Sequence, residues 1–369
     1  MILRISRTYP RKKQQGIGLH CYYYTKYIKL PTVIFTKKIN DQITDLPQNA
    51  SVYEINYRDI KFDKLNENYF KLILIIFTKI YGELIYFYKI FFFIFNHRKK
   101  IKLIHLHSAN YLLCAFLLKI IFNIPLVVNF GGTDLKRILK FFILKKIVKR
   151  VDAILYVSSH MKKDLDSFCP NTKKYYIGNG VDTDFFIPTN NKNNFNILSI
   201  GNFRWQKGYK YLFEAIKNIK EAIPKLKLFI AGGGDEIESY KLLARKLNID
   251  SYVEFLGSIS RIEIKNYLHN SHVYVSSSVS EGFPKALIES IACGIPVVVT
   301  DVGQSKKIVS NKLGIVVPPN NSLALANALK KILLNNELKK EYRNNCINSR
   351  KQFSWKNVIS IVEKCYSEI

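Results

Sequence analysis

Two glutamates eight positions apart mark the stretch of this sequence that is richest in chemistry. Residues 276–301 read SSSVSEGFPKALIESIACGIPVVVTD and contain Glu281 and Glu289. Pro284 suits the first turn of a helix, because its missing N–H would be unpaired there, and Gly294 suits the position just past the last turn. The pattern predicts a helix of about ten residues between two parallel strands, with its N-terminus at the carboxyl edge of the sheet, where such sheets bind ligands.

The chemistry expected at that edge is the binding of a phosphorylated sugar. Free N–H groups and the helix dipole favour a phosphate at a helix N-terminus, and Gly282 permits close approach of the backbone. A carboxylate beside a diphosphate is electrostatically unfavourable. Glu281 and Glu289 fit the site if each accepts hydrogen bonds from sugar hydroxyls instead.

The elements that must position these residues alternate between apolar strand-like runs and amphipathic stretches, which is typical of βαβ units. Buried strands are predicted at Ile2–Ser6, Thr32–Thr36, Ile101–His107, Leu126–Phe130, Ala153–Ser158, Asn196–Ile200, Leu226–Ala231, Val253–Leu256, Val273–Ser276 and Pro296–Thr300. Helices are predicted near Tyr209–Lys220 and Glu236–Leu247. The economical interpretation is an α/β protein of two doubly wound, Rossmann-like domains that face each other.

An Asn-rich segment at residues 188–195 interrupts this alternation. It is polar and lacks periodicity, which predicts an interdomain linker. The linker divides an N-terminal domain over residues 1–187 from a C-terminal domain over residues 196–352. The length of 369 residues also fits two domains better than one.

The formal net charge of +29 is unevenly placed along the chain. Residues 1–180 hold 31 Lys and Arg against 11 Asp and Glu, whereas the remaining residues hold 26 against 17. A basic first half indicates an anionic membrane, an anionic substrate, a nucleic acid or a Lys-rich solvated surface. The six cysteines lie far apart without a C-x-x-C pair, which argues against a zinc site and favours a reduced, cytoplasmic compartment.

One very apolar stretch bears on the membrane question. Residues 70–95 include four charged positions, Lys71, Lys79, Glu83 and Lys89, so no run reaches the roughly 18 uncharged residues of a spanning helix. The charges cluster on one side of a helix, which predicts either a deeply buried helix or a helix in a membrane interface. The basic residues between 136 and 150 suit a lipid-headgroup face or a solvated one.

The spacing of Glu281-x7-Glu289 closely resembles the E-x7-E motif of glycosyltransferase family 4, whose members are retaining enzymes of the GT-B fold. Further segments resemble family motifs in the family's order: Gly178–Asp182 with Phe185, Gly201 with Lys207-Gly208, Phe229–Gly234, Val253–Gly257 and Phe353–Trp355. The resemblance covers nearly the whole chain and is strongest from Gly178 on. It implies two Rossmann-like domains facing across a cleft, with residues 353–369 as a helix that packs back toward the N-terminal domain.

By this resemblance, Glu281 and Lys207 are the catalytic residues. Glu281 would contact the donor sugar, and Lys207 would pair with the diphosphate and offset the charge that develops on the leaving group. Glu289 would accept hydrogen bonds from the ribose. The further donor contacts implied are Gly282, Phe283, Pro284, Gly257 near the base, and Gly16 and Gly18 of the first domain's glycine loop. No metal or other cofactor is implied.

Three departures from the family pattern bear on activity. Asn202 stands where the family has Arg, and Arg204 is the residue that could supply the guanidinium instead. Gly131 stands where the family often has a sugar-binding His, which leaves His107 or Asp134 as candidate sugar or acceptor contacts. The family's G-G-x-x-E motif reads GQSKK at residues 303–307. A homologue that binds donor without turning it over therefore stays open.

The expected partners are a UDP- or GDP-sugar donor and a lipid-linked or polysaccharide acceptor, met at the cytoplasmic face of an anionic membrane. A basic nucleic-acid-binding protein is the main alternative, but no recognised binding module is present. A nicotinamide or flavin oxidoreductase would require G-x-G-x-x-G, and the spacing of Gly16 and Gly18 does not supply it. His105 and His107 alternate on a predicted buried strand, where a histidine is more often structural than catalytic.

Overall fold

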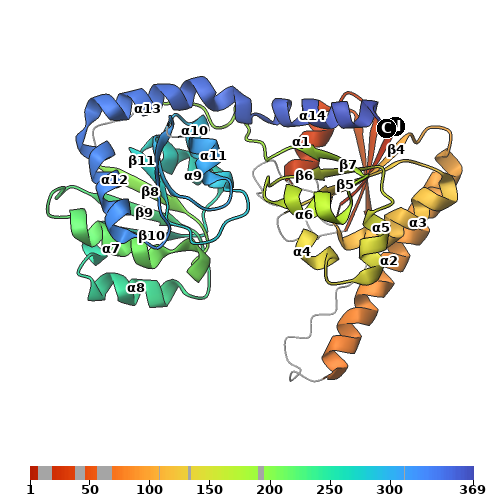
Figure 1. Cartoon of the computed structure of the whole chain (residues 1–369), viewed down its shortest axis with the longest axis horizontal. Helices are drawn as coiled ribbons and strands as arrows, with labels where there is room; N and C mark the ends of the chain where they lie inside the picture. Colours follow the sequence, from red (N-terminus) through yellow and green to blue (C-terminus); the bar gives the residue numbers. More distant parts are fainter. Residues whose placement is uncertain are drawn as a thin grey trace. The chain divides into compact units, whose positions relative to one another are not determined.

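The structure is a computed structural model that describes residues 1–6, 19–37, 46–55, 69–107, 109–131, 134–189, 195–310 and 312–369. It separates into two compact units (Figure 1). The first unit comprises Met1–Ile177 together with Ile359–Ile369, and the second comprises Gly178–Val358. Most of the predicted linker at residues 188–195 lies outside the described residues.

The first unit is built on a seven-stranded, all-parallel sheet with the strand order β3-β2-β1-β4-β5-β6-β7. Its strands are β1 Ile2–Ile5, β2 Thr32–Lys37, β3 Ala50–Ile55, β4 Leu103–Leu106, β5 Leu126–Phe130, β6 Ala153–Tyr156 and β7 Lys173–Tyr176. The five strands predicted in this half are confirmed. The two that the sequence analysis missed, β3 and β7, lie at the sheet edges and are partly exposed, so neither carries a continuous apolar run.

Helices cover this sheet and connect its strands in the usual βαβ manner. They are α1 Leu19–Tyr27, α2 Tyr69–His97, α3 Leu112–Phe122, α4 Asp134–Ile138, α5 Phe142–Val148 and α6 Met161–Phe168, with the 3₁₀ turn η1 Ala109–Tyr111. The apolar core between the sheet and α2, α3 and α5 includes Leu3, Ile90 and Leu118. No helix among the described residues is long and apolar enough to cross a membrane.

Helix α2 combines the two alternatives that the sequence left open. Tyr86, Ile90 and Ile94 are buried in the core, whereas Tyr88 on the opposite side is 63% exposed. Burial raises the pKa of Glu83 to about 7. The side chains of residues 69–80, including Lys71 and Lys79, lie outside the described part.

The second unit is built on a six-stranded parallel sheet with the order β10-β9-β8-β11-β12-β13. Its strands are β8 Asn196–Ile200, β9 Lys227–Ala231, β10 Val253–Gly257, β11 Val273–Ser276, β12 Val297–Thr300 and β13 Gly314–Val317. Its helices are α7 Tyr209–Ile219, α8 Ile237–Lys246, α9 Arg261–His269, α10 Lys285–Ala292, α11 Ser305–Val309, α12 Ser322–Leu334 and α13 Asn336–Ser349. Short 3₁₀ turns are η2 Trp205–Lys207, η3 Asp250–Tyr252 and η4 Arg350–Phe353.

The segment before the predicted linker belongs with the second unit. The N–H of Val181 donates to the carbonyl of Phe353 at 2.8 Å, and Phe186 is fully buried among residues of the second core. A Cβ on Gly180 would lie 2.3 Å from the Trp355 ring, so glycine is required for this packing. These contacts explain why the boundary falls at residue 178 and not after residue 187.

The last helix, α14 Trp355–Ser367, begins two residues after the start expected from the sequence. Its C-terminal residues belong with the first unit. There the Tyr366 hydroxyl lies 2.5 Å from His105 Nδ1, and the Tyr175 hydroxyl donates to Glu368 at 2.5 Å. All six cysteines of the chain are buried and unpaired.

Candidate active site

The order of the strands fixes where a ligand site can form in the second unit. The chain runs β8, β9 and β10 toward one side of the sheet and then returns to β11 on the other side of β8. At such a reversal, the loops after the two central strands part and leave a crevice at their carboxyl ends. Those loops carry Lys207, after β8, and Glu281, after β11.

Lys207 and Glu281 meet in a direct ion pair at this crevice. Lys207 Nζ lies 2.5 Å from Glu281 Oε2, and both side chains keep some exposure, 29% and 18%. The Ser278 hydroxyl donates to the same carboxylate oxygen at 3.4 Å. The structure thus brings together the two residues predicted to be catalytic, in a position that solvent can reach.

Backbone and hydroxyl contacts fasten the lysine turn to the glutamate loop. The Ser277 hydroxyl donates to the Lys207 carbonyl at 2.8 Å, and the N–H of Val279 donates to the Gln206 carbonyl at 2.8 Å. Gly208 has φ +61°, and a Cβ there would lie 2.2 Å from the Ser277 carbonyl oxygen. Only glycine fits this position, because it combines a left-handed backbone with a contact closer than any side chain tolerates.

Gly201 makes room for the lysine side chain. A Cβ at this position would lie 2.7 Å from Lys207 Cε, so the aliphatic part of Lys207 crosses directly over the glycine backbone. The Gly201 carbonyl also accepts a hydrogen bond from the Tyr209 hydroxyl at 2.7 Å. The Gly201…Lys207-Gly208 spacing therefore has a geometric reason at both of its glycines.

Helix α10 starts beside the glutamate loop. Pro284 is its N-cap residue and the helix runs eight residues, two fewer than predicted, before Gly294 ends it with φ +74°. Two arginines satisfy carbonyls at its C-terminal end, since Arg350 Nε donates to Ala292 at 3.1 Å and Arg343 Nη1 donates to Gly294 at 3.2 Å. These contacts fix the helix that presents its N-terminus toward the crevice.

The loop after β12 supports the glutamate loop from the other side. Gly303 has φ +58°, and a Cβ there would lie 2.4 Å from the Glu281 carbonyl oxygen. The backbone at Glu281 and Gly282 therefore rests directly on Gly303. The sequence analysis noted residues 303–307 only as a departure from a motif, and it missed this packing role.

Glu289 lies on α10 and faces Arg261 from α9. Its Oε1 atom lies 4.0 Å from Arg261 Nη2. Burial raises the pKa of Glu289, and the charges of Arg261 and Lys285 partly offset that effect. Both Glu281 and Glu289 act on the buried hydroxyl of Tyr274, whose pKa is raised mainly by burial and further by these carboxylates, so the two glutamates border one region.

Arg261 is a site residue that the sequence analysis did not find. Its guanidinium lies 5.1 Å from the ring centres of both Phe185 and Phe186, and it is 8% exposed. The rings hold the cation beside Glu289. The only signal in the sequence was Phe185 itself, within the motif that follows Gly178.

The other predicted donor contacts lie at the same sheet edge with less defined roles. Gly257 ends β10 with φ +66°, and a Cβ there would meet nothing within 4 Å. Phe283 is partly buried against the core. Arg204 and Trp205 are exposed, and Trp205 is 65% exposed.

The candidates from the first unit have a different outcome. Gly16 and Gly18 lie outside the described residues. Asp134 begins α4, and its Oδ2 atom accepts a hydrogen bond from the Gly131 N–H at 2.8 Å. His107 is 5% exposed and its Nε2 atom lies 3.1 Å from Arg4 Nη1.

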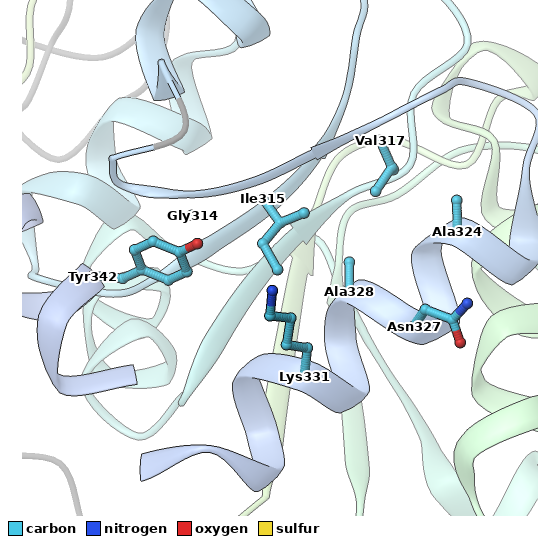
Figure 2. A pocket seen from close by; sticks show the side chains of 8 residues that line it. All are labelled: Gly314, Ile315, Val317, Ala324, Asn327, Ala328, Lys331 and Tyr342. Carbon is cyan, nitrogen blue, oxygen red and sulfur yellow. The ribbon is translucent and has the colours of Figure 1, made fainter. Parts of the chain in front are cut away.

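A separate cavity of about 350 Å³ lies between the edge strand β13 and helices α12 and α13 (Figure 2). Figure 2 shows the exposed Lys331 reaching into it below Ile315, with Tyr342 beside them. None of the predicted site residues lines this cavity. Within the described part of the chain, no group of three His, Cys, Asp or Glu side chains is placed to hold a metal ion.

Two family profiles match consecutive parts of the chain. The profile described as Glycosyl transferases group 1 matches residues 181–352, and the one described as Glycosyltransferase Family 4 matches residues 64–185. Together they cover the second unit and much of the first.

Among its relatives, the chain is 31% identical over 276 residues to an uncharacterized glycosyltransferase of Methanocaldococcus jannaschii, which covers 73% of this chain and 76% of that protein. It is 24% identical over 285 residues to a phosphatidylinositol N-acetylglucosaminyltransferase from Arabidopsis thaliana, covering 73% and 62%. A solved Anabaena protein in complex with UDP is similar in fold, with a TM-score of 0.70 at 17% identity over all of both chains.

Proposed function

This chain belongs to glycosyltransferase family 4 and has its GT-B fold, and on that premise we propose that it transfers a sugar from a nucleoside diphosphate to an acceptor hydroxyl. The observation that carries the proposal is the Lys207–Glu281 pair at the strand reversal of the second sheet. A cation and a carboxylate 2.5 Å apart there provide one group for a diphosphate and one for a sugar.

In the proposed reaction, the donor separates this ion pair. Lys207 turns to the diphosphate and stabilises the negative charge that builds on it as the bond to the sugar breaks. Glu281 is then free to accept hydrogen bonds from hydroxyls of the sugar, and Glu289 accepts from the ribose. Gly282, Phe283 and Pro284 place backbone beside the sugar, and retention of the anomeric configuration follows the family resemblance.

Nucleotide binding can be tested on the purified full chain by thermal shift with UDP, GDP and their glucose and mannose derivatives. We expect one base to raise the melting temperature, because a ligand at about 100 times its Kd stabilises the folded state by about 2.7 kcal/mol, or roughly 5–10 °C for a unit of this size. The solved Anabaena complex makes UDP the first compound to try. No shift with any of them would contradict the proposed donor site.

We place the acceptor at a membrane surface, on the basis of one face of the first unit. Five large apolar side chains on α2 are spaced three or four residues apart and are 47–65% exposed: Tyr81, Leu84, Tyr88, Phe92 and Phe95. The surface continues over α3, which packs against α2 and α5 (Figure 1), and over the start of α5. There the exposed residues are Leu113, Leu117, Ile120, Ile121, Phe141, Phe142 and Ile143. We call these twelve residues the apolar face.

The charge around the apolar face fits an anionic bilayer. Residues 81–150 contain 13 Lys and Arg but only Glu83 and Asp134 as acids. The pKa of Glu83 is raised to about 7, which reduces its negative charge near neutral pH. Apolar side chains flanked by cations insert into the headgroup region of anionic membranes. The phosphatidylinositol named for the Arabidopsis relative also supports a lipid acceptor.

Vesicle flotation tests this placement. We expect the chain to bind phosphatidylglycerol-containing vesicles more strongly than purely phosphatidylcholine vesicles, and Tyr88→Glu/Phe92→Glu to weaken that binding by about tenfold or more. Leu242→Glu/Leu323→Glu is the matched control, because both leucines are more than 60% exposed on the second unit. Equal binding of the α2 variant and the control would remove the apolar face from the proposal.

A further inference from the structure

The first sheet has its own strand reversal, and a buried polar cluster occupies it. The chain runs β1, β2, β3 to one side and returns at β4 on the other side of β1, so the crevice lies at the carboxyl ends of β1 and β4. Arg4 on β1 and His105 on β4 are 0% exposed, and His107 just after β4 is 5% exposed. The equivalent position in the second sheet holds the Lys207–Glu281 pair.

The hydrogen bonds of this cluster determine where its protons lie. Arg4 Nη1 is 3.1 Å from both His105 Nδ1 and His107 Nε2. A guanidinium can only donate, so each of these ring nitrogens must present a lone pair. The protons of the two neutral rings are then on His105 Nε2 and His107 Nδ1.

Several donors in this cluster have no acceptor within the described part of the chain. His105 Nε2, His107 Nδ1, Arg4 Nε and Arg4 Nη2 are all buried without a hydrogen-bond partner there. Burial lowers the pKa of both histidines, with the charge of Arg4 contributing, so neither ring adds a second positive charge. Unsatisfied buried donors are rare in folded proteins, and four of them side by side call for an acceptor.

The cluster also lacks a negative charge. No carboxylate of the described residues pairs with Arg4. The sequence around β1 offers none either, because residues 1–40 contain nine Lys and Arg and no Asp or Glu. A buried cation without a counter-charge is costly, and an oxyanion would satisfy both the charge and the free donors.

Aromatic rings hold the cluster in shape. The Arg4 guanidinium lies 5.5 Å from the ring centre of Tyr24, and the His105 and His107 rings stack at 4.2 Å. His20 on α1 packs at 5.3 Å from His107, and Tyr366 of α14 contacts His105. Donors from three side chains are thus fixed around one position, which suits a group with several oxygens.

We propose that Arg4, His105 and His107 form a binding site for a phosphoryl group carried by the acceptor substrate. A phosphoryl group presents three acceptor oxygens and negative charge, whereas every free polar atom of the cluster named above is a donor. The site lies at the carboxyl edge of the first sheet, and His107 is its outermost residue. The assignment to the acceptor rests on the proposed glycosyl transfer.

The test compares inorganic phosphate with UDP on the full chain at constant ionic strength. We expect phosphate to stabilise the wild type more than chloride does, and Arg4→Met to weaken phosphate binding by about 10- to 100-fold, since it removes hydrogen bonds from a charged donor. UDP binding should be unchanged in Arg4→Met. Lys207→Ala should behave in the opposite way, losing UDP and keeping phosphate.

A second pair of variants keeps the test valid if Arg4→Met does not fold. His107→Asn retains an N–H close to the position of Nδ1 and should keep phosphate binding, whereas His107→Phe should lose it. Unaltered phosphate binding in both Arg4→Met and His107→Phe would overturn the site. An equal loss of UDP and phosphate in Arg4→Met would assign the phosphoryl group to the donor and overturn the acceptor assignment. Failure of UDP to bind any variant, with phosphate binding intact, would contradict the proposed donor and not this site.

Discussion

Lys207→Ala is expected to lower kcat about 100- to 1000-fold while the protein stays folded. The size follows from the loss of one fixed charge that stabilises a developing negative charge. The fold should survive because the lysine is part-exposed and its turn is held by backbone atoms of Gln206 and by the hydroxyl of Ser277. Glu281→Ala should give a loss of similar order, through the sugar contact.

Steady-state transfer assays with thermal melts as a folding check would measure these effects. Lys331→Ala is the matched control, because Lys331 is an exposed lysine of the same unit that lines the separate cavity in Figure 2. It should retain wild-type activity. If Lys207→Ala or Glu281→Ala were as active as this control, the ion pair would be a structural contact only, and the proposed active site would be wrong.

Gly208→Ala is expected to cost about 2–4 kcal/mol of folding free energy and most of the activity. Alanine would have to adopt φ +61° and would also place its Cβ 2.2 Å from the Ser277 carbonyl oxygen. The backbone conformation and the clash both oppose folding. Relief of the clash would separate the lysine turn from the glutamate loop and so displace Lys207 from Glu281.

Gly257→Ala separates the two causes in a thermal or urea melt. Gly257 has nearly the same backbone angle, φ +66°, but a Cβ there would meet nothing within 4 Å. It should therefore lose only the backbone part, about 1–2 kcal/mol. If the two alanine variants were equally stable, the contact between Gly208 and Ser277 would not be what joins the two loops.

The central strands and the helix between Pro284 and Gly294 were predictable because each has a local signature. Buried parallel strands read as continuous apolar runs, and proline and glycine bracket a helix. The edge strands β3, β7 and β13 escaped detection. Their burial is incomplete, so their sequences give a weaker apolar signal than the central strands do.

The ion pair of the second unit was predicted through its motifs, whereas the cluster of the first unit was not. Arg4 and His105 are 101 residues apart, and nothing local in either strand indicates that they pair. The alternation of His105 and His107 suggested structural histidines, which agrees with their burial but does not reveal their shared partner. Contacts made only by strand order cannot be deduced from periodicity.

The burial of every cysteine gives this protein a built-in chemical reporter. Burial raises the pKa of the thiols of Cys21, Cys293 and Cys365 to about 12, so almost no reactive thiolate exists in the closed structure at neutral pH. Alkylation must then wait for the surrounding structure to open. Because Cys21 and Cys365 belong to the first unit and Cys293 to the second, mass spectrometry of labelled peptides would time the opening of each half separately, without any added probe.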